Sequence, residues 1–115
     1  MPRNDLIRLR HMLEAAREAL AFSAGRGPAD LEQSRLLTYG LIRCLEIIGE
    51  AAARMGEGTR GLLPSVPWQQ IIGMRNRLIH AYFDVDIDMV WRTVSEDLPL
   101  LNDLLTNIID QHPAT

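Results

Sequence analysis

The sequence predicts an all-α fold, an up-and-down bundle of four to five helices that forms a single domain over residues 1–115. Apolar side chains recur at the three- and four-residue spacing of helices in several long segments. Glycine and proline separate these segments, and no segment alternates apolar and polar residues as a half-buried strand would. With 115 residues, of which 47% are hydrophobic, the chain can bury one modest core.

The first two helices are expected over residues 4–24 and 29–55, on either side of a Gly-Arg-Gly-Pro break. Asn4 is a suitable N-cap for the first helix. Its apolar side chains at helical spacing are Leu6, Leu9, Leu13, Ala16 and Leu20. The second helix is long and apolar enough to be buried on more than one side, and Gly56 ends it.

The second half of the chain is expected to contain a loop and two further helices. The loop covers residues 59–66, and a third helix follows over residues 67–81. The fourth helix is expected over residues 87–110, with an interruption or kink at Pro99, because proline removes one helical hydrogen bond.

The charge composition excludes several classes of protein. A net charge of −3 argues against a general basic nucleic-acid binder. All 12 basic residues are arginines, which excludes lysine nucleophiles and Schiff-base chemistry. Any contact with nucleic acid would have to come from a local arginine cluster, which a symmetric dimer would double.

Cysteine usage and hydropathy favour a cytoplasmic protein. Cys44 is the single cysteine, so an intrachain disulfide is excluded, and its apolar neighbours predict a buried, inert thiol. No apolar run approaches the ~20 residues needed to span a bilayer. The N-terminal residues lead into a charged amphipathic pattern and do not predict a signal peptide.

The most informative pattern is R-N-x-x-x-H-x-Y, formed by Arg75, Asn76, His80 and Tyr82. Arginine stays charged and binds phosphate oxygens bidentately, and histidine transfers protons near neutral pH. Together they could cleave RNA without a metal ion or cofactor. The ribose 2′-hydroxyl would attack the adjacent phosphorus while His80 moves protons, Arg75 stabilises the developing charge and Asn76 orients the imidazole or the phosphate.

The spacing leaves the geometry of this motif open. On an ideal helix Asn76 and His80 share a face, whereas Arg75 and His80 lie about 140° apart. A bent arginine side chain, or two copies of the motif meeting across a dimer axis, would bring the groups together. Arg75 in a surface ion pair and His80 at a helix C-terminus would fit the same spacing.

A charged stripe is expected on the second helix, formed by Arg43, Glu46, Glu50 and Arg54. One interpretation is ion pairing along a solvated helix face. The other is that the stripe faces the third helix or a partner chain, where a carboxylate such as Glu50 would orient Arg75. Arg77 would bind a second phosphate or remain a surface charge.

Over residues 5–109 the chain resembles the HEPN superfamily, in particular HepT-like toxins of minimal nucleotidyltransferase toxin–antitoxin pairs. The resemblance rests on I-I-G-E-A-A at 47–52, P-W at 67–68, the motif region at 71–80 and V-W at 90–91. It implies a homodimeric α-helical bundle with two arginine–histidine motifs at the interface, and metal-independent endoribonuclease activity. Arg75 and His80 match the catalytic pair of the family, and Asn76 matches its polar position.

Tyr82 matches the tyrosine that closes the HepT-type motif. The resemblance implies that a partner nucleotidyltransferase, the antitoxin, silences the toxin by transferring AMP onto this residue, because a bulky anion would occupy the phosphate site. Tyr82 as a half-buried aromatic residue is the alternative. A different class of function also fits, a non-catalytic helical module that binds the nucleotidyltransferase and presents its substrate.

Overall fold

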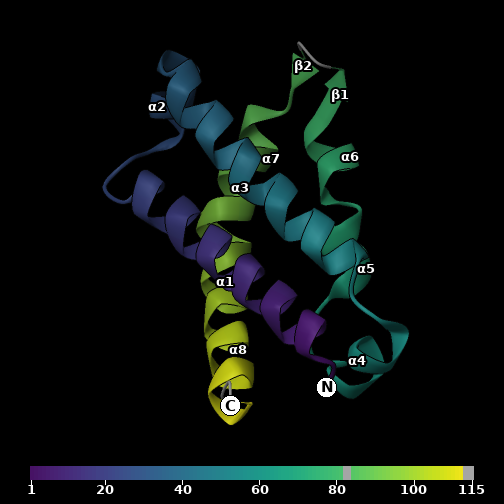
Figure 1. Ribbon diagram of the computed structural model, residues 1–115. Coiled ribbons are helices and arrows are strands. Elements are labelled where there is room, and N and C mark those ends of the chain that lie inside the picture. The colour runs from purple at the N-terminus through teal and green to yellow at the C-terminus, as the bar shows by residue number, and fades with distance from the viewer. Residues whose placement is uncertain (82–83, 113–115) are drawn as a thin grey trace.

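The computed structural model describes residues 1–81 and 84–112, with the backbone alone at residues 80 and 81. The chain forms a helical bundle with one short two-stranded ribbon (Figure 1). Its elements are α1 (Arg3–Ser23), α2 (Pro28–Gln33), α3 (Arg35–Ala53), α4 (Glu57–Leu62), α5 (Trp68–Ile72), α6 (Met74–Leu78), β1 (Ile79–Ala81), β2 (Asp84–Val85), α7 (Ile87–Arg92), the π-helix η1 (Thr93–Asp97) and α8 (Leu98–Gln111). The predicted all-α class is confirmed.

The bundle is built around the antiparallel pair of α1 and α3 (Figure 1). Helix α8 packs against α1, and α5 and α6 pack against α3, so the chain runs up and down through the fold. The side chains at the centre are almost fully buried, and they include Leu9, Met12, Leu41, Leu45, Ile48, Val90, Val94, Leu98 and Leu105. Within the part of the chain that the structure describes, no helix is long and apolar enough to cross a lipid bilayer.

The predicted second helix is wrong in one detail, because it is divided at Ser34 into α2 and α3. The Ser34 hydroxyl accepts a hydrogen bond from the Leu37 amide at 3.1 Å and so caps α3. The Thr38 hydroxyl donates to the Leu31 carbonyl at 2.7 Å, which satisfies a carbonyl in α2. Serine competes well for N-cap positions, and this competition outweighs the continuous helical pattern.

The predicted third helix is corrected more strongly. Helix α5 ends before Gly73, α6 ends at Leu78, and the chain continues as β1, which pairs antiparallel with β2. Ile79 pairs with Val85, and the Asp86 amide donates to the Leu78 carbonyl at 2.8 Å. Because these strands have only three and two residues, they are too short to show an alternating pattern, and the expectation of no strand was wrong.

The predicted fourth helix is interrupted at the expected place. Residues 93–97 form one π-helical stretch between α7 and α8, and Pro99 follows as the second residue of α8. Proline has no amide hydrogen, and its ring clashes with the carbonyl four residues earlier in a regular helix. The wider π-helix accommodates this conflict without ending the helical segment.

Cys44 is buried in α3, as predicted, with 2% of its surface exposed. Burial raises the pKa of its thiol to about 11, and the carboxylate of Glu18 adds to this effect. Since the thiolate is the reactive form, Cys44 is an inert core residue near neutral pH.

A buried carboxylate fastens the start of α1 to α4. Asp5 is 3% exposed and accepts hydrogen bonds from the Thr59 hydroxyl at 2.5 Å, from Arg8 Nη1 at 2.8 Å and from the Gly56 amide at 3.4 Å. The bond from Thr59 lowers the pKa of Asp5 below its usual value of 3.8, against the opposing effect of burial.

Two further predictions are corrected in this region. The predicted loop over 59–66 is partly helical, because α4 occupies its first residues. The predicted N-cap at Asn4 is wrong, because α1 begins after Pro2 without a side-chain cap.

Asp5→Ala is expected to lower the free energy of unfolding by about 2–3 kcal/mol near neutral pH, because it leaves the Thr59 hydroxyl and the Gly56 amide without their acceptor. The pKa of Asp5 is lower in the folded chain than in the unfolded chain. Its contribution is therefore present above about pH 4 and is lost as the pH falls through the folded-state pKa. Urea denaturation of both proteins between neutral and acidic pH measures this effect.

The control for Asp5→Ala is Asp110→Ala, which changes an exposed carboxylate on α8. We expect this control to have nearly wild-type stability throughout the series. A difference between wild type and Asp5→Ala that does not narrow at acidic pH would contradict the assigned role of the Asp5 charge.

Candidate active site

Arg75 lies on the surface of α6 and forms an ion pair with α3. Its Nε donates to Glu46 Oε2 at 3.2 Å. The Arg75 side chain is 60% exposed, whereas that of Glu46 is 26% exposed. Among the described residues, the two Nη groups of Arg75 have no hydrogen-bond partner. Glu46 therefore holds one edge of the guanidinium and leaves its end open to an anion.

The charged stripe of α3 is divided between two neighbours. Glu46 points to α6, whereas Glu50 and Arg54 line a hollow beside α1. No ion pair joins members of the stripe within the described part of the chain. The contact with Arg75 is made by Glu46 and not by Glu50, which was the predicted orienting carboxylate.

Asn76 and Arg77 occupy different positions on α6. Asn76 is exposed next to Arg75. Arg77 Nη2 donates to the Gln70 carbonyl at 2.8 Å, so this guanidinium satisfies a backbone group of α5. Arg77 also lines an apolar cavity of about 320 Å³ between α5, α6 and α8, with Met74 and Leu101 among its walls. Arg77 therefore makes a structural contact with α5, on a different side of α6 from the one that carries Arg75.

His80 follows the end of α6 in the middle of β1. The Ile79 amide donates to the Arg75 carbonyl, and the backbone at Ile79 is already extended, with φ −126° and ψ 109°. The 140° separation of an ideal helix therefore does not apply to Arg75 and His80. The side chain of His80 and the whole of Tyr82 lie outside the described residues.

Glycine brings α3 and α5 close together beneath this site. A Cβ atom at Gly49 would lie 3.3 Å from the Ile71 carbonyl oxygen, which is closer than side chains normally approach backbone. The close crossing sets the start of α6 beside α3, and this positions Arg75 against Glu46. Sequence reasoning identified Arg75 and the stripe that contains its partner. It favoured Glu50 over Glu46, because the stripe contains two carboxylates one helical turn apart.

The comparison with protein families adds a decisive observation. The family model "Ribonuclease HepT-like" matches residues 12–108. The chain belongs to the HepT-like ribonuclease family. The family model spans α3, α6, β1 and α7, and so includes the whole arginine–histidine motif.

Several curated proteins are similar to this HepT-like chain. A "Putative RNase" from Methanocaldococcus jannaschii is 38% identical over 76% of this chain and 81% of its own length. A "Probable ribonuclease HepT" from Thermococcus cleftensis is 48% identical over 55% of this chain and 57% of its own. A "Putative RNase" from Caldanaerobacter subterraneus is 33% identical over 90% of this chain and 92% of its own. No solved structure matches.

Glu46→Gln is expected to lower the kcat of RNA cleavage by about 10- to 100-fold, because Arg75 loses the charge that aligns it. The free energy of unfolding should change by less than about 1 kcal/mol, since the Arg75 side chain of this pair is largely exposed. Steady-state cleavage kinetics and urea denaturation measure the two effects separately.

The matched control is Glu57→Gln, which removes an exposed carboxylate from α4. It should leave both kcat and stability near the wild-type values. Equal kcat values for Glu46→Gln and wild type would show that Glu46 does not position Arg75 for the reaction.

Proposed function

We propose that this HepT-like chain is an endoribonuclease that cleaves RNA by attack of a ribose 2′-hydroxyl on the adjacent phosphorus, without a metal ion. The proposal is carried by one observation, the Arg75 guanidinium held along one edge by Glu46 with its other end open. An arginine fixed in this way is prepared to bind a phosphodiester bidentately. Membership in a ribonuclease family and the names of the similar proteins support RNA as the substrate.

In the proposed reaction His80 moves the protons. It accepts the proton of the 2′-hydroxyl as the new bond between the 2′-oxygen and phosphorus forms. The bond from phosphorus to the 5′-oxygen then breaks, and that oxygen takes up a proton as it leaves. The products are a 2′,3′-cyclic phosphate and a free 5′-hydroxyl. Arg75 stabilises the negative charge on the phosphoryl oxygens, and Asn76 orients the imidazole or the phosphate.

We further propose that the working enzyme is a homodimer with two such motifs at its interface. Arg75 and Asn76 are exposed on one chain, so a single chain does not enclose them. A second copy would supply another wall, exclude water and strengthen the interaction between arginine and phosphate. Glu50 and Arg77 are proposed to act outside the reacting centre, because their contacts and lining positions lie away from Arg75.

His80→Ala and Arg75→Gln are expected to reduce RNA cleavage strongly. Loss of a positioned acid or base costs about 100- to 10,000-fold, and loss of a charge-stabilising donor about 100- to 1,000-fold. The assay uses purified protein with a chelator present, and mass spectrometry identifies cyclic phosphate ends. Sedimentation should show the same dimer for wild type and for both variants.

The matched controls are His112→Ala and Arg92→Gln, which change an exposed histidine after α8 and an exposed arginine in α7. Both should retain wild-type cleavage. Full cleavage by His80→Ala, after removal of contaminating ribonucleases, would refute the assignment. Absence of cleavage by the wild type on several RNA substrates would do the same and would favour a nucleotidyltransferase-binding module.

The proposed regulator is a minimal nucleotidyltransferase that acts as the antitoxin and transfers AMP from ATP to the Tyr82 hydroxyl. In this step the tyrosine oxygen bonds to the α-phosphorus of ATP and pyrophosphate leaves. The anionic adduct would stand two residues from His80 and compete with RNA for Arg75. The position of Tyr82 in the sequence motif supports this proposal.

Incubation of the chain with the nucleotidyltransferase and ATP is expected to add AMP to Tyr82 and to abolish cleavage. Intact-mass and peptide mass spectrometry give the number and position of the adducts. Tyr82→Phe should remain unmodified and active under the same conditions, and Tyr39→Phe is the control for an exposed tyrosine elsewhere. Modification of Tyr82→Phe to the wild-type extent would exclude Tyr82 as the acceptor.

A further inference from the structure

A second group of basic side chains lies outside the arginine–histidine motif. A hollow of about 310 Å³ opens between α1 and α3, which lie next to each other in the fold (Figure 1). Its polar lining consists of Asn4, Arg8 and His11 from α1 and of Glu50 and Arg54 from α3. None of these side chains has a part in the proposed cleavage reaction.

Arg8 is held in place within this hollow. Its Nη1 donates to the buried carboxylate of Asp5 at 2.8 Å, and that carboxylate is also bound by Thr59 and the Gly56 amide. The negative charge of Asp5 is thus shared among several donors, and the other nitrogens of Arg8 have no partner among the described residues. An arginine fixed by a buried carboxylate loses little conformational freedom when it binds an anion.

Arg54 faces the same hollow from the end of α3. It is exposed, and the described residues offer its guanidinium no hydrogen bond or ion pair. Glu50 lies one turn earlier and also lines the hollow. The lining of the hollow thus holds two arginines, a histidine and the carboxylate of Glu50, while the carboxylate of Asp5 lies behind Arg8 and is shared with Thr59 and Gly56. This set suits a ligand that presents a phosphate next to a hydrogen-bond donor. A bare anion would be repelled by Glu50.

The hollow lies on the same exposed stripe of α3 that carries Glu46 and therefore Arg75. Eight residues separate Glu46 from Arg54, a distance of about 12 Å along the helix axis. An extended single strand that places one phosphate at Arg75 would reach the hollow within a few nucleotides. Between these two positions the surface of α3 is open at Glu50 and Ala53, which are exposed.

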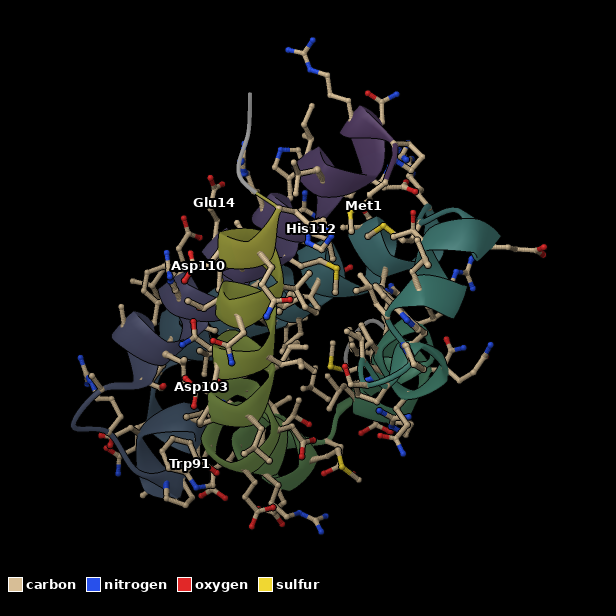
Figure 2. All side chains as sticks on the ribbon, turned by 90° about the horizontal axis from the view of Figure 1, so that it is seen from below. Met1, Glu14, Trp91, Asp103, Asp110 and His112 are labelled. Atoms are coloured by element: carbon tan, nitrogen blue, oxygen red, sulfur yellow. The ribbon has the colours of Figure 1, made fainter. Side chains whose placement is uncertain are left out.

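The two parts of the chain also differ in charge. Residues 1–78 contain 11 arginines and eight acidic residues, whereas residues 84–112 contain one arginine and seven acidic residues. Acidic side chains such as Asp103 and Asp110 project from α8, with Glu14 of α1 (Figure 2). A polyanion would thus be directed away from α8 and towards the helices that carry Arg75 and the hollow.

We propose that the hollow between α1 and α3 is an RNA backbone site, in which Arg8, His11 and Arg54 bind a phosphate and Glu50 accepts a hydrogen bond from a ribose 2′-hydroxyl. This inference deepens the proposed ribonuclease function and rests on it. The 2′-hydroxyl is the group by which proteins distinguish RNA from DNA. The site therefore contributes both affinity and the choice of RNA, at a distance from the cleaved bond.

The test is a salt series of single-stranded RNA binding by chains that carry His80→Ala, so that the RNA stays intact. Arg54→Gln in this background is expected to weaken binding several-fold at low salt. It should also reduce the slope of log affinity against log salt by about 0.7, the value for one phosphate contact. The matched control is Arg26→Gln, which removes an exposed arginine from the turn between α1 and α2.

The role of Glu50 is tested with RNA and DNA of the same sequence. Glu50→Gln is expected to bind DNA more tightly than the parent chain and to lose preference for RNA, because the repulsive charge and the strongest acceptor are removed together. Circular dichroism of each variant verifies the fold. An unchanged ratio of RNA to DNA affinity would overturn the assigned role of Glu50.

The outcomes separate this site from the cleavage proposal. Equal salt slopes for Arg54→Gln and Arg26→Gln would overturn the backbone site, even if wild type cleaves RNA in a His80-dependent manner. A reduced slope for Arg54→Gln supports the site, and it does so even if no cleavage is found. Absence of RNA binding by the parent chain at low salt would also overturn it.

Discussion

The packing of α3 between α1 and α5 is the constraint on which the remaining structure depends. Gly49 allows α5 to approach within contact distance, and this close crossing sets α6 against the edge of α3. One edge of α3 thereby supplies Glu46 to Arg75, and the other supplies Glu50 and Arg54 to the hollow at α1. A rotation of α3 about its axis would disturb both sites. Because the buried face of α3 fixes this rotation, it is as important for the two sites as the charged face.

The sequence predicted those parts of the fold that are long and periodic. These parts extend over several helical turns, so their apolar residues repeat at helical spacing often enough to be recognised. They are α1, most of α3 and the interrupted fourth helix. The incorrect predictions concern short segments, in which a few residues determine the secondary structure. Ser34 ends one helix by a side-chain hydrogen bond, and β1 and β2 depend on pairing between residues 79 and 85, which no local propensity specifies.

The candidate site was predictable in its residue types and only partly in its contacts. The placement of Arg75 and Asn76 on a short exposed helix follows from their polar character within an apolar segment. The choice of Glu46 over Glu50 depends on how far α3 is rotated towards α6, a difference of about 40° between two positions of one helical stripe. Such a difference arises from core packing across the bundle and leaves no trace in the spacing of charges.

The position of His80 in β1 has a consequence for synthesis on the ribosome. The partner strand β2 follows the motif along the chain, and so do α7, η1 and α8, which complete the core. A nascent chain whose last exposed residue is His80 therefore has Arg75 and Glu46 but no strand to hold the histidine segment. Domains acquire their final packing only after the whole unit has emerged from the ribosome. The arginine–histidine motif of this ribonuclease is therefore completed only after synthesis of the chain has passed β2 and α8.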